Sequence, residues 1–373
     1  MPLFARGFYL TGIEFLFLGL LLGPHFLNII NNETVEELAP LTILLLGWIG
    51  LLFGFQFEIP KLKRISGKFF TAAAVESVLT FGMVFTGTMY ILPVIGTIPD
   101  GIITTAALIM GAAAASTAQT GLALRKPDSF PEHRKTLKLL RYISSIDGLT
   151  GILILGFTFL SRDSISNYSL TISERIAGFL IPIFACTGFM ILYLLFLIRR
   201  KQESELSLVV IGMAIFTSGA AMILNFSPLF ANFLLGVCIV NLTRDKERIF
   251  NLLVSVEKPV YLLLLIFLGC MLQPPEPWML LAAALFFLFR TMGKMSGGYI
   301  VTCLQKKETH LKPYLGYGLL EQGGLPFAIL YDFYQGFPGK TAGQIISIVI
   351  ISIIFNDFIS PIMLNRLLKG RES

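Results

Sequence analysis

Residues 141–155 read RYISSIDGLTGILIL and place one carboxylate, Asp147, in the middle of an otherwise apolar helix. A carboxylate inside the hydrocarbon of a bilayer is costly, so by default it marks a site for a proton, an ion or a charged partner. Other ionisable residues also fall inside apolar segments: the acids Glu14, Glu76, Glu321 and Asp357, and the bases Arg290 and Lys294. This short set holds the candidates for function.

The composition of the chain is typical of a polytopic membrane protein. It has 373 residues, of which 55% are hydrophobic and 14% charged, and its mean hydropathy is +0.76. No soluble domain has that balance. The net charge of +6 does not indicate nucleic-acid binding, because the positive residues gather in the loops of one side. The sequence contains no nucleophile–base pair, cofactor motif or metal-ligand spacing, and its four Cys are scattered singly. We therefore expect neither an enzyme nor a cofactor, and no metal beyond a transported ion.

Hydropathy predicts an all-α protein with about twelve transmembrane helices in a single domain over residues 1–373. A bilayer core about 30 Å thick takes roughly 20 apolar residues as helix. On this rule the predicted spans are 8–29, 39–57, 69–94, 101–124, 137–160, 176–198, 206–224, 228–243, 259–273, 277–303, 313–333 and 342–366.

The charge distribution supports an even number of spans. With the N-terminus in the cytoplasm, the loops predicted to lie outside hold only Arg162, Arg175 and Lys340 among the 29 Lys and Arg. Cytoplasmic loops carry an excess of positive residues, so both termini are expected in the cytoplasm.

Two of the predicted spans carry a break near the middle. Residues 115–121, ASTAQTG, combine Ser, Thr, Gln and Gly in the fourth span, and residues 321–326, EQGGLP, combine Gly-Gly with Pro in the eleventh. Helices 3–5 and 10–12 start on opposite sides of the membrane, so the two triplets form an inverted repeat. Paired interrupted helices in two inverted halves indicate the binding site of a transporter. We expect helices 4 and 11 to cross there.

The order and spacing of several motifs resemble those of a known superfamily. The segments are 14–24, 41–64, 116–118, 145–148, 230–241, 290–294 and 318–324. Together they resemble the monovalent cation:proton antiporter superfamily, most closely its Kef-like and sodium/hydrogen exchanger branch. The resemblance covers nearly the whole chain. It implies a membrane protein of the prokaryotic inner membrane, with a homodimeric scaffold (8–57 and 206–273) and a moving core (69–160 and 277–366).

The resemblance implies exchange of Na⁺ or K⁺ for H⁺ by alternating access. Asp147 would bind the cation or the proton in turn, with oxygens from Thr117 and the broken-helix carbonyls. Ser116, Glu76, Glu321 and Gln322 are further candidates for the ion or proton site. Arg290 and Lys294 would compensate charge, and Arg290 is favoured slightly as the group at the midplane.

Each assignment has a structural alternative. Asp147 could form only an ion pair with a helix 10 cation, and Thr117 could bond back to its own helix. Glu76 could be a satisfied structural acid, and Glu321 could pair with Arg290 or Lys294. Asp357 and Glu14 are read as structural.

One departure from the superfamily bears on stoichiometry. Ile146 stands where the superfamily has Asn or Asp before the aspartate, so that side chain can neither ligate a cation nor carry a second proton. This predicts one-for-one, electroneutral exchange. Two alternatives stay open: a sodium-coupled solute symporter of related fold, and a non-transporting ion sensor or regulatory protein.

Overall fold

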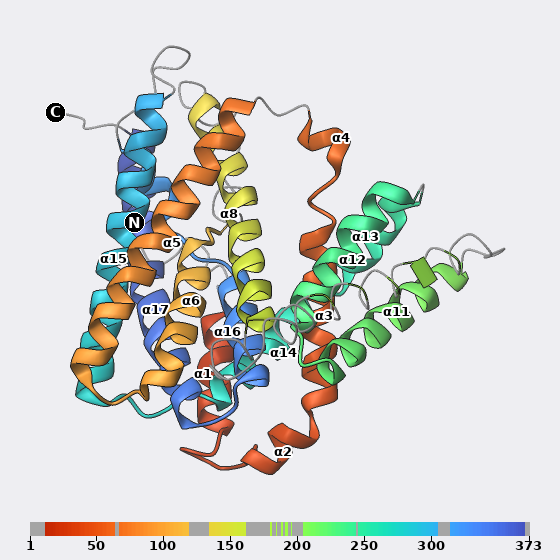
Figure 1. The fold of residues 1–373 in the computed structure, drawn as a ribbon, viewed down its shortest axis with the longest axis horizontal. Coiled ribbons are helices and arrows are strands. Elements are labelled where there is room, and N and C mark those ends of the chain that lie inside the picture. Colours follow the sequence, from red (N-terminus) through yellow and green to blue (C-terminus); the bar gives the residue numbers. More distant parts are fainter. Residues whose placement is uncertain are drawn as a thin grey trace, which may run out of the picture.

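The computed structural model describes residues 12–63, 67–118, 134–161, 204–243, 245–304 and 314–369, with isolated positions between 180 and 195. All regular structure in these residues is helical (Figure 1). In the first part of the chain the helices are α1 (Ile13–Leu22), α2 (Asn32–Glu37), α3 (Ala39–Gly54), α4 (Ile59–Leu62), α5 (Gly67–Ile95), α6 (Asp100–Ala115) and α8 (Arg134–Leu160). In the second part they are α11 (Ser204–Ile223), α12 (Pro228–Leu242), α13 (Lys246–Ser255), α14 (Glu257–Cys270), α15 (Pro277–Leu304), the 3-10 helix η4 (Leu315–Leu319), α16 (Leu325–Gly336) and α17 (Lys340–Lys369).

The lengths of these helices vary more than the lengths of the predicted spans. In the described part of the chain, α5, α8, α15 and α17 are long and apolar enough to cross a membrane singly, and α13 with α14 passes as a pair bent by 45°. The other apolar helices, α1, α3, α6, most of α11 and α12, have 10–17 residues. The predicted sixth span, 176–198, lies almost wholly outside the described residues.

Several predicted boundaries move for local reasons. The first helix ends at Leu22 and not at residue 29, because Gly23 precedes Pro24 and takes an extended backbone. The fourth ends at Ala115, since Ser116 is extended with ψ 143°. The ninth is preceded by α13, an additional helix whose apolar side buries Ile249 and Leu253.

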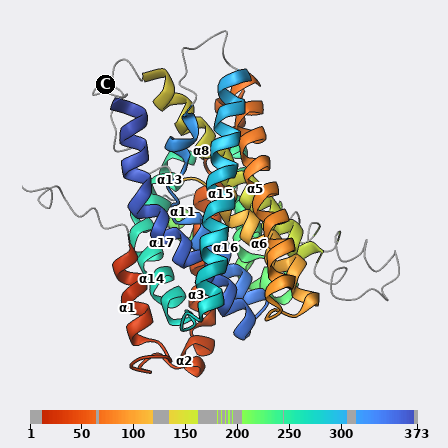
Figure 2. The ribbon, with the colours of Figure 1, turned by 90° about the vertical axis from the view of Figure 1, so that its left-hand side faces the viewer.

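The helices pack in two groups that meet along α16. The core bundle, as we call it, contains α5, α6, α8, α15, η4, α16 and α17, and α5 lies against α15 in it (Figure 2). The panel contains α1, α3, α11, α12 and α14. Its helices approach closely: a Cβ on Gly236 of α12 would lie 2.6 Å from the carbonyl oxygen of Leu51 on α3. Within the core bundle α16 packs on α6, α8 and α17, and it also touches α3, α12 and α14 of the panel.

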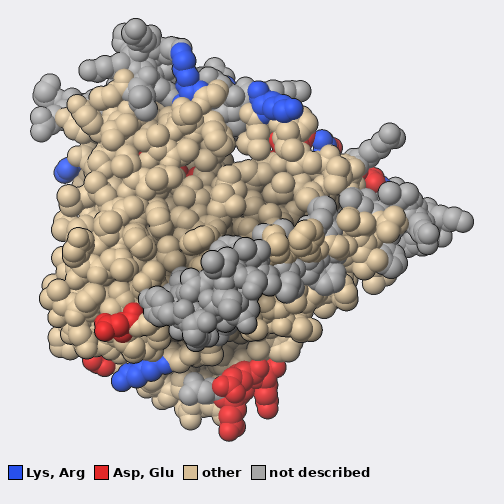
Figure 3. Space-filling view, in the orientation of Figure 1, with Lys and Arg blue, Asp and Glu red and all other residues tan. Residues whose placement is uncertain are grey.

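The surface agrees with a membrane location. Figure 3 shows a broad band of uncharged atoms, with most of the visible charged side chains near its upper and lower ends. We call these ends the α4 face and the α2 face, after the short helices that lie there in Figure 1. A band of this kind is typical of a protein that spans a bilayer.

Candidate functional site

The fourth span loses its helical structure after Ala115, where α6 ends. At the end of α6 the last carbonyl groups have no partner within the helix. The chain continues through Ser116 to Ala118 without regular structure. The predicted second half of this span, within residues 119–124, lies outside the described residues.

The eleventh span is broken as its sequence predicts. It starts as the 3-10 helix η4, loses regular structure from Leu320 and resumes as α16, with Pro326 in the first turn. The two breaks touch, because the Ala118 N–H donates to the Glu321 carbonyl at 2.8 Å. The site is therefore framed by non-helical backbone from two distant parts of the chain.

Arg290 of α15 ties the two breaks together. Its Nε donates to the Ala114 carbonyl at 3.1 Å and its Nη2 to that of Ser116 at 3.2 Å. Its Nη1 donates to the Leu320 carbonyl at 2.7 Å, on the other break. The guanidinium group thus satisfies carbonyls that the breaks leave free, and its charge lies at the negative end of α6.

Lys294, one turn further along α15, meets the acids. Its Nζ lies 2.9 Å from Asp147 Oδ2 on α8 and 3.1 Å from Glu76 Oε1 on α5. It also donates to the Ala115 carbonyl at 2.7 Å. All three side chains are fully buried. Lys294, and not Arg290, is therefore the cation in contact with Asp147.

Only one of the two carboxylate oxygens of Asp147 accepts hydrogen bonds from the described residues. Thr117 donates its hydroxyl to Asp147 Oδ2 at 2.6 Å, so this oxygen receives both Thr117 and Lys294. The other oxygen, Oδ1, is buried and has no hydrogen-bond partner among the described residues. A buried carboxylate oxygen without a donor can take a proton, a cation or a water molecule.

Glu76 is the second acid of the cluster. Thr80, one turn along α5, donates to Glu76 Oε1 at 3.0 Å. Gly297 of α15 packs directly on the Glu76 side chain, where a Cβ would lie 2.8 Å from its Cγ. With both acids ionised, Asp147, Glu76 and Lys294 together carry one formal negative charge, which one Na⁺ or one proton would balance.

Two other predicted site residues support the breaks. Ser116 bonds back to the Ala113 carbonyl at 2.9 Å through its hydroxyl. Gln322 donates to the same carbonyl at 3.3 Å and accepts from Asn356 of α17 at 3.1 Å. Asn356 is fully buried and was not among the predicted site residues.

The remaining predicted acids lie apart from the Lys294 cluster. Glu321 contributes its backbone carbonyl to the contact between the breaks, and its side chain is half-buried. Asp357 is half-buried on α17, and Glu14 is exposed in the first turn of α1. Asp332 of α16 is absent from the predicted set, yet it is fully buried. The rule that selected the other acids, a charge inside an apolar span, applies equally to it.

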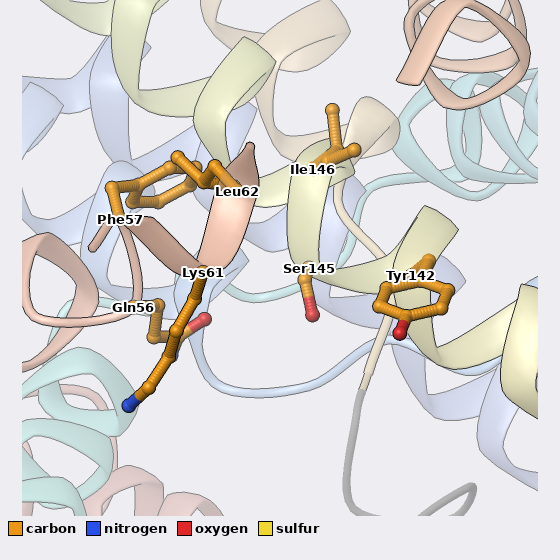
Figure 4. A pocket seen from close by; sticks show the side chains of 7 residues that line it. All are labelled: Gln56, Phe57, Lys61, Leu62, Tyr142, Ser145 and Ile146. Carbon is orange, nitrogen blue, oxygen red and sulfur yellow. The ribbon is translucent and has the colours of Figure 1, made fainter. Parts of the chain in front are cut away.

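A cavity of about 160 Å³ lies beside the site on the side of the α4 face. Figure 4 shows its two walls: Gln56, Phe57, Lys61 and Leu62 come from the segment around α4, and Tyr142, Ser145 and Ile146 come from α8. Since Ile146 precedes Asp147, the cavity reaches the turn of α8 that carries the site carboxylate.

Comparison with known proteins decides the family. The model of a family described as sodium/hydrogen exchanger, transmembrane, matches residues 11–370. The chain belongs to the sodium/hydrogen exchanger family. This confirms the resemblance inferred from the motifs. As a family member the protein is an integral membrane transporter of cations and protons.

The fold of this exchanger is also found among solved structures. The sodium proton antiporter MjNhaP1 from Methanocaldococcus jannaschii superposes with a TM-score of 0.63, over 96% of this chain and 92% of that one, at 19% sequence identity. That similarity establishes the fold, including the all-α architecture. No curated protein matches the exchanger in sequence.

Proposed function

We propose that the protein exchanges Na⁺ for H⁺ at Asp147 by alternating access. The observation that carries this proposal is the open Oδ1 of a fully buried carboxylate, placed where two broken helices meet. Its other oxygen is held by Thr117 and Lys294. Membership of the sodium/hydrogen exchanger family supports Na⁺ as the cation, and K⁺ is the alternative.

The geometry favours displacement of Lys294 by the incoming ion. The carbonyls of Ala115, Ser116 and Leu320 already accept from Lys294 or Arg290, so an ion would have to share them with these cationic side chains. The available oxygens are those of Asp147, Thr117 and Glu76. A cation that binds there competes with the ammonium group, which can stay on Glu76 and Ala115. A proton on Asp147 competes in turn with the cation.

One-for-one exchange follows from the charge balance. With Glu76 and Asp147 both ionised, the cluster carries one negative charge in excess, and Ile146 adds no further acid. One Na⁺ or one proton neutralises it. Moving the unneutralised charge through the membrane costs at least several kcal/mol, so the empty carboxylate stays in place. The exchange is therefore electroneutral.

Alternating access requires the core bundle to move against the panel. We assign the α4 face to the cytoplasm, because the Lys-rich loops and both termini are predicted there. The cavity between α4 and α8 is then the cytoplasmic approach to Asp147. The panel forms a homodimer in a prokaryotic inner membrane and supplies a fixed support.

A second function has one observation in its favour. If Glu76 is protonated, the ion pair between Lys294 and Asp147 leaves no net charge for an ion to balance, as expected in an ion sensor that does not transport. This candidate predicts ion binding without turnover.

The test is exchange by the purified protein in vesicles that hold a pH gradient and a quenched dye. Addition of Na⁺ should restore fluorescence with the wild type and not with Asp147→Asn. Glu14→Gln, which changes an exposed acid on α1 of the panel, is the matched control and should behave as wild type. Absence of recovery with Na⁺ and K⁺ between about pH 6 and 9, together with detectable ion binding, would establish the sensor. A reproducible current would contradict electroneutral exchange.

A further inference from the structure

Asp332 is a buried carboxylate that the exchange site does not use. It lies on α16 and is fully buried. Ser227, the residue that caps α12, donates its hydroxyl to Asp332 Oδ2, and the Leu229 N–H donates to the same oxygen at 3.3 Å. The described residues include no ion pair to Asp332. Its Oδ2 is held by these two donors, at the positive end of α12.

This contact joins the core bundle to the panel. Asp332 belongs to a helix that packs on α6, α8 and α17, whereas Ser227 and Leu229 belong to the start of α12, which packs on α3. A movement of the core bundle relative to the panel must stretch or break the contact. We call Asp332, Ser227 and Leu229 the α12 latch.

The latch lies on the opposite side of Asp147 from the cavity. α16 begins beside Gly148 of α8, where a Cβ would meet Leu325 at 3.1 Å, and it ends with Gly336 packed on Phe159. It therefore runs along α8 toward the α2 face. Asp332 is near its far end, whereas the cavity is lined by Tyr142, Ser145 and Ile146 on the near side.

A second contact closes the same region. Phe230, in the first turn of α12, packs on Gly156 of α8, where a Cβ would lie 2.6 Å from the ring. The start of α12 thus makes a polar contact with α16 and a ring-on-backbone contact with α8, both on the α2 side of Asp147. The polar contact is also incomplete, because Asp332 Oδ1 has no hydrogen-bond partner among the described residues.

We propose that the α12 latch holds the α2-face side of the transport path closed and is released when the core bundle moves to expose Asp147 on that side. The inference rests on the proposed exchange function. It assigns Asp332 and Ser227 a positioning role between two helices and no contact with the ion. Separation of α16 from α12 leaves the carboxylate without donors, so release requires water to reach it from the α2 face.

The experiment measures access to the site level from the α2 face. A single cysteine, Leu325→Cys, is introduced after Cys186, Cys238, Cys270 and Cys303 are changed to Ser. A charged, membrane-impermeant maleimide is added on the α2 side of oriented vesicles, and the labelling rate is compared among latch variants. We expect Asp332→Leu and Ser227→Ala each to raise this rate about tenfold, because each removes a buried hydrogen bond between α16 and α12.

Two comparisons distinguish loss of the α12 latch from a general destabilisation of the helix packing. Ser218→Ala removes a buried hydrogen bond to Asn232 that lies within the panel, and it should leave labelling unchanged. The double variant S227A/D332L should label no faster than the faster single variant, because both changes break one contact. Asp332→Asn, which keeps an acceptor oxygen, should have a smaller effect and serves if the Leu variant does not fold.

Unchanged labelling in the latch variants, an equal rise with Ser218→Ala, or independent effects that multiply in the double variant would each overturn the latch. The labelling needs no transport. A wild type that fails to exchange Na⁺ for H⁺ would therefore contradict the proposed function while the latch result still stands.

Discussion

Lys294 Nζ lies 2.9 Å from Asp147 Oδ2 and 3.1 Å from Glu76 Oε1, so one ammonium group holds carboxylates from two different helices. All three groups are fully buried. A buried charge is tolerated only when it is paired and hydrogen-bonded. The cluster therefore acts as a unit, and a change to one member affects the other two.

Loss of the ammonium group should destabilise the fold. Lys294→Ala leaves two buried acids without a cation and should cost about 3–5 kcal/mol, the usual effect of breaking a buried ion pair. The measurement is thermal unfolding in detergent at neutral pH. Glu76→Gln in the same chain should recover part of the loss, since it removes one unpaired charge. Equal unfolding temperatures for Lys294→Ala and wild type would show that the three groups do not form a charged cluster.

A lysine should not be able to replace the guanidinium group of Arg290 in stability or in exchange. Arg290→Lys keeps the charge, but one ammonium group cannot reach the carbonyls of Ala114, Ser116 and Leu320 with the same geometry. We expect a loss of stability and at least about a tenfold fall in the exchange rate, because each orphaned carbonyl costs about 1–3 kcal/mol. An Arg290→Lys protein with wild-type exchange would mean that charge alone suffices.

For Na⁺ binding, the hydroxyl group of Thr117 should matter more than the volume of its side chain. Thr117→Val removes the donor to Asp147 at similar volume, and the apparent KM for Na⁺ should rise about tenfold, the usual cost of a hydrogen bond to a charged group. Thr117→Ser keeps the hydroxyl and should retain a KM close to wild type. If Val and Ser variants have the same KM, the hydroxyl does not take part in binding.

Glu58 should make the local stability of the segment around α4 depend on pH. Hydrogen bonds from Lys246 of α13 and from Lys61, each at 2.7 Å, hold the pKa of the Glu58 carboxyl below its usual range. A lowered pKa in the folded state contributes stability that is present above the ordinary glutamate value of about 4.3 and is lost as the pH falls through the lowered value. The protection factors for amide hydrogen exchange in residues 55–63, which correct for the intrinsic slowing of exchange in acid, should therefore fall as the pH drops.

Glu58→Gln is the control for that prediction. It should show lower protection factors in residues 55–63 already at neutral pH, with little further change in acid. A variant that keeps the wild-type acid dependence would assign it to another group.

The contact between Gly324 and Tyr261 should not tolerate a methyl group. A Cβ on Gly324 would overlap the ring of Tyr261, which belongs to α14 of the panel. Gly324→Ala should therefore lower exchange strongly, because the start of α16 must shift beside the site. Adding Tyr261→Ala makes space and should restore part of the rate, whereas Tyr261→Phe keeps the ring and should not.

The sequence alone determined the membrane location, most helices and the positions of both breaks. These are local properties: a long apolar run forms a helix in lipid, and Gly-Gly-Leu-Pro at 323–326 interrupts it. The same reasoning found the buried charges, because Asp147, Glu76, Arg290 and Lys294 each stand in an apolar run.

Only the tertiary structure decided which of these charges meet. Arg290 and Lys294 are one helical turn apart, and hydropathy cannot distinguish them. The packing of α15 against α5, α8 and the break after α6 directs Lys294 to the acids and Arg290 to the carbonyls. The contact between Asp332 and Ser227 was equally unpredictable from the sequence, because the two residues are 105 positions apart in the chain. Such contacts depend on how helices cross, and that follows from the packing of the whole bundle and not from any single segment.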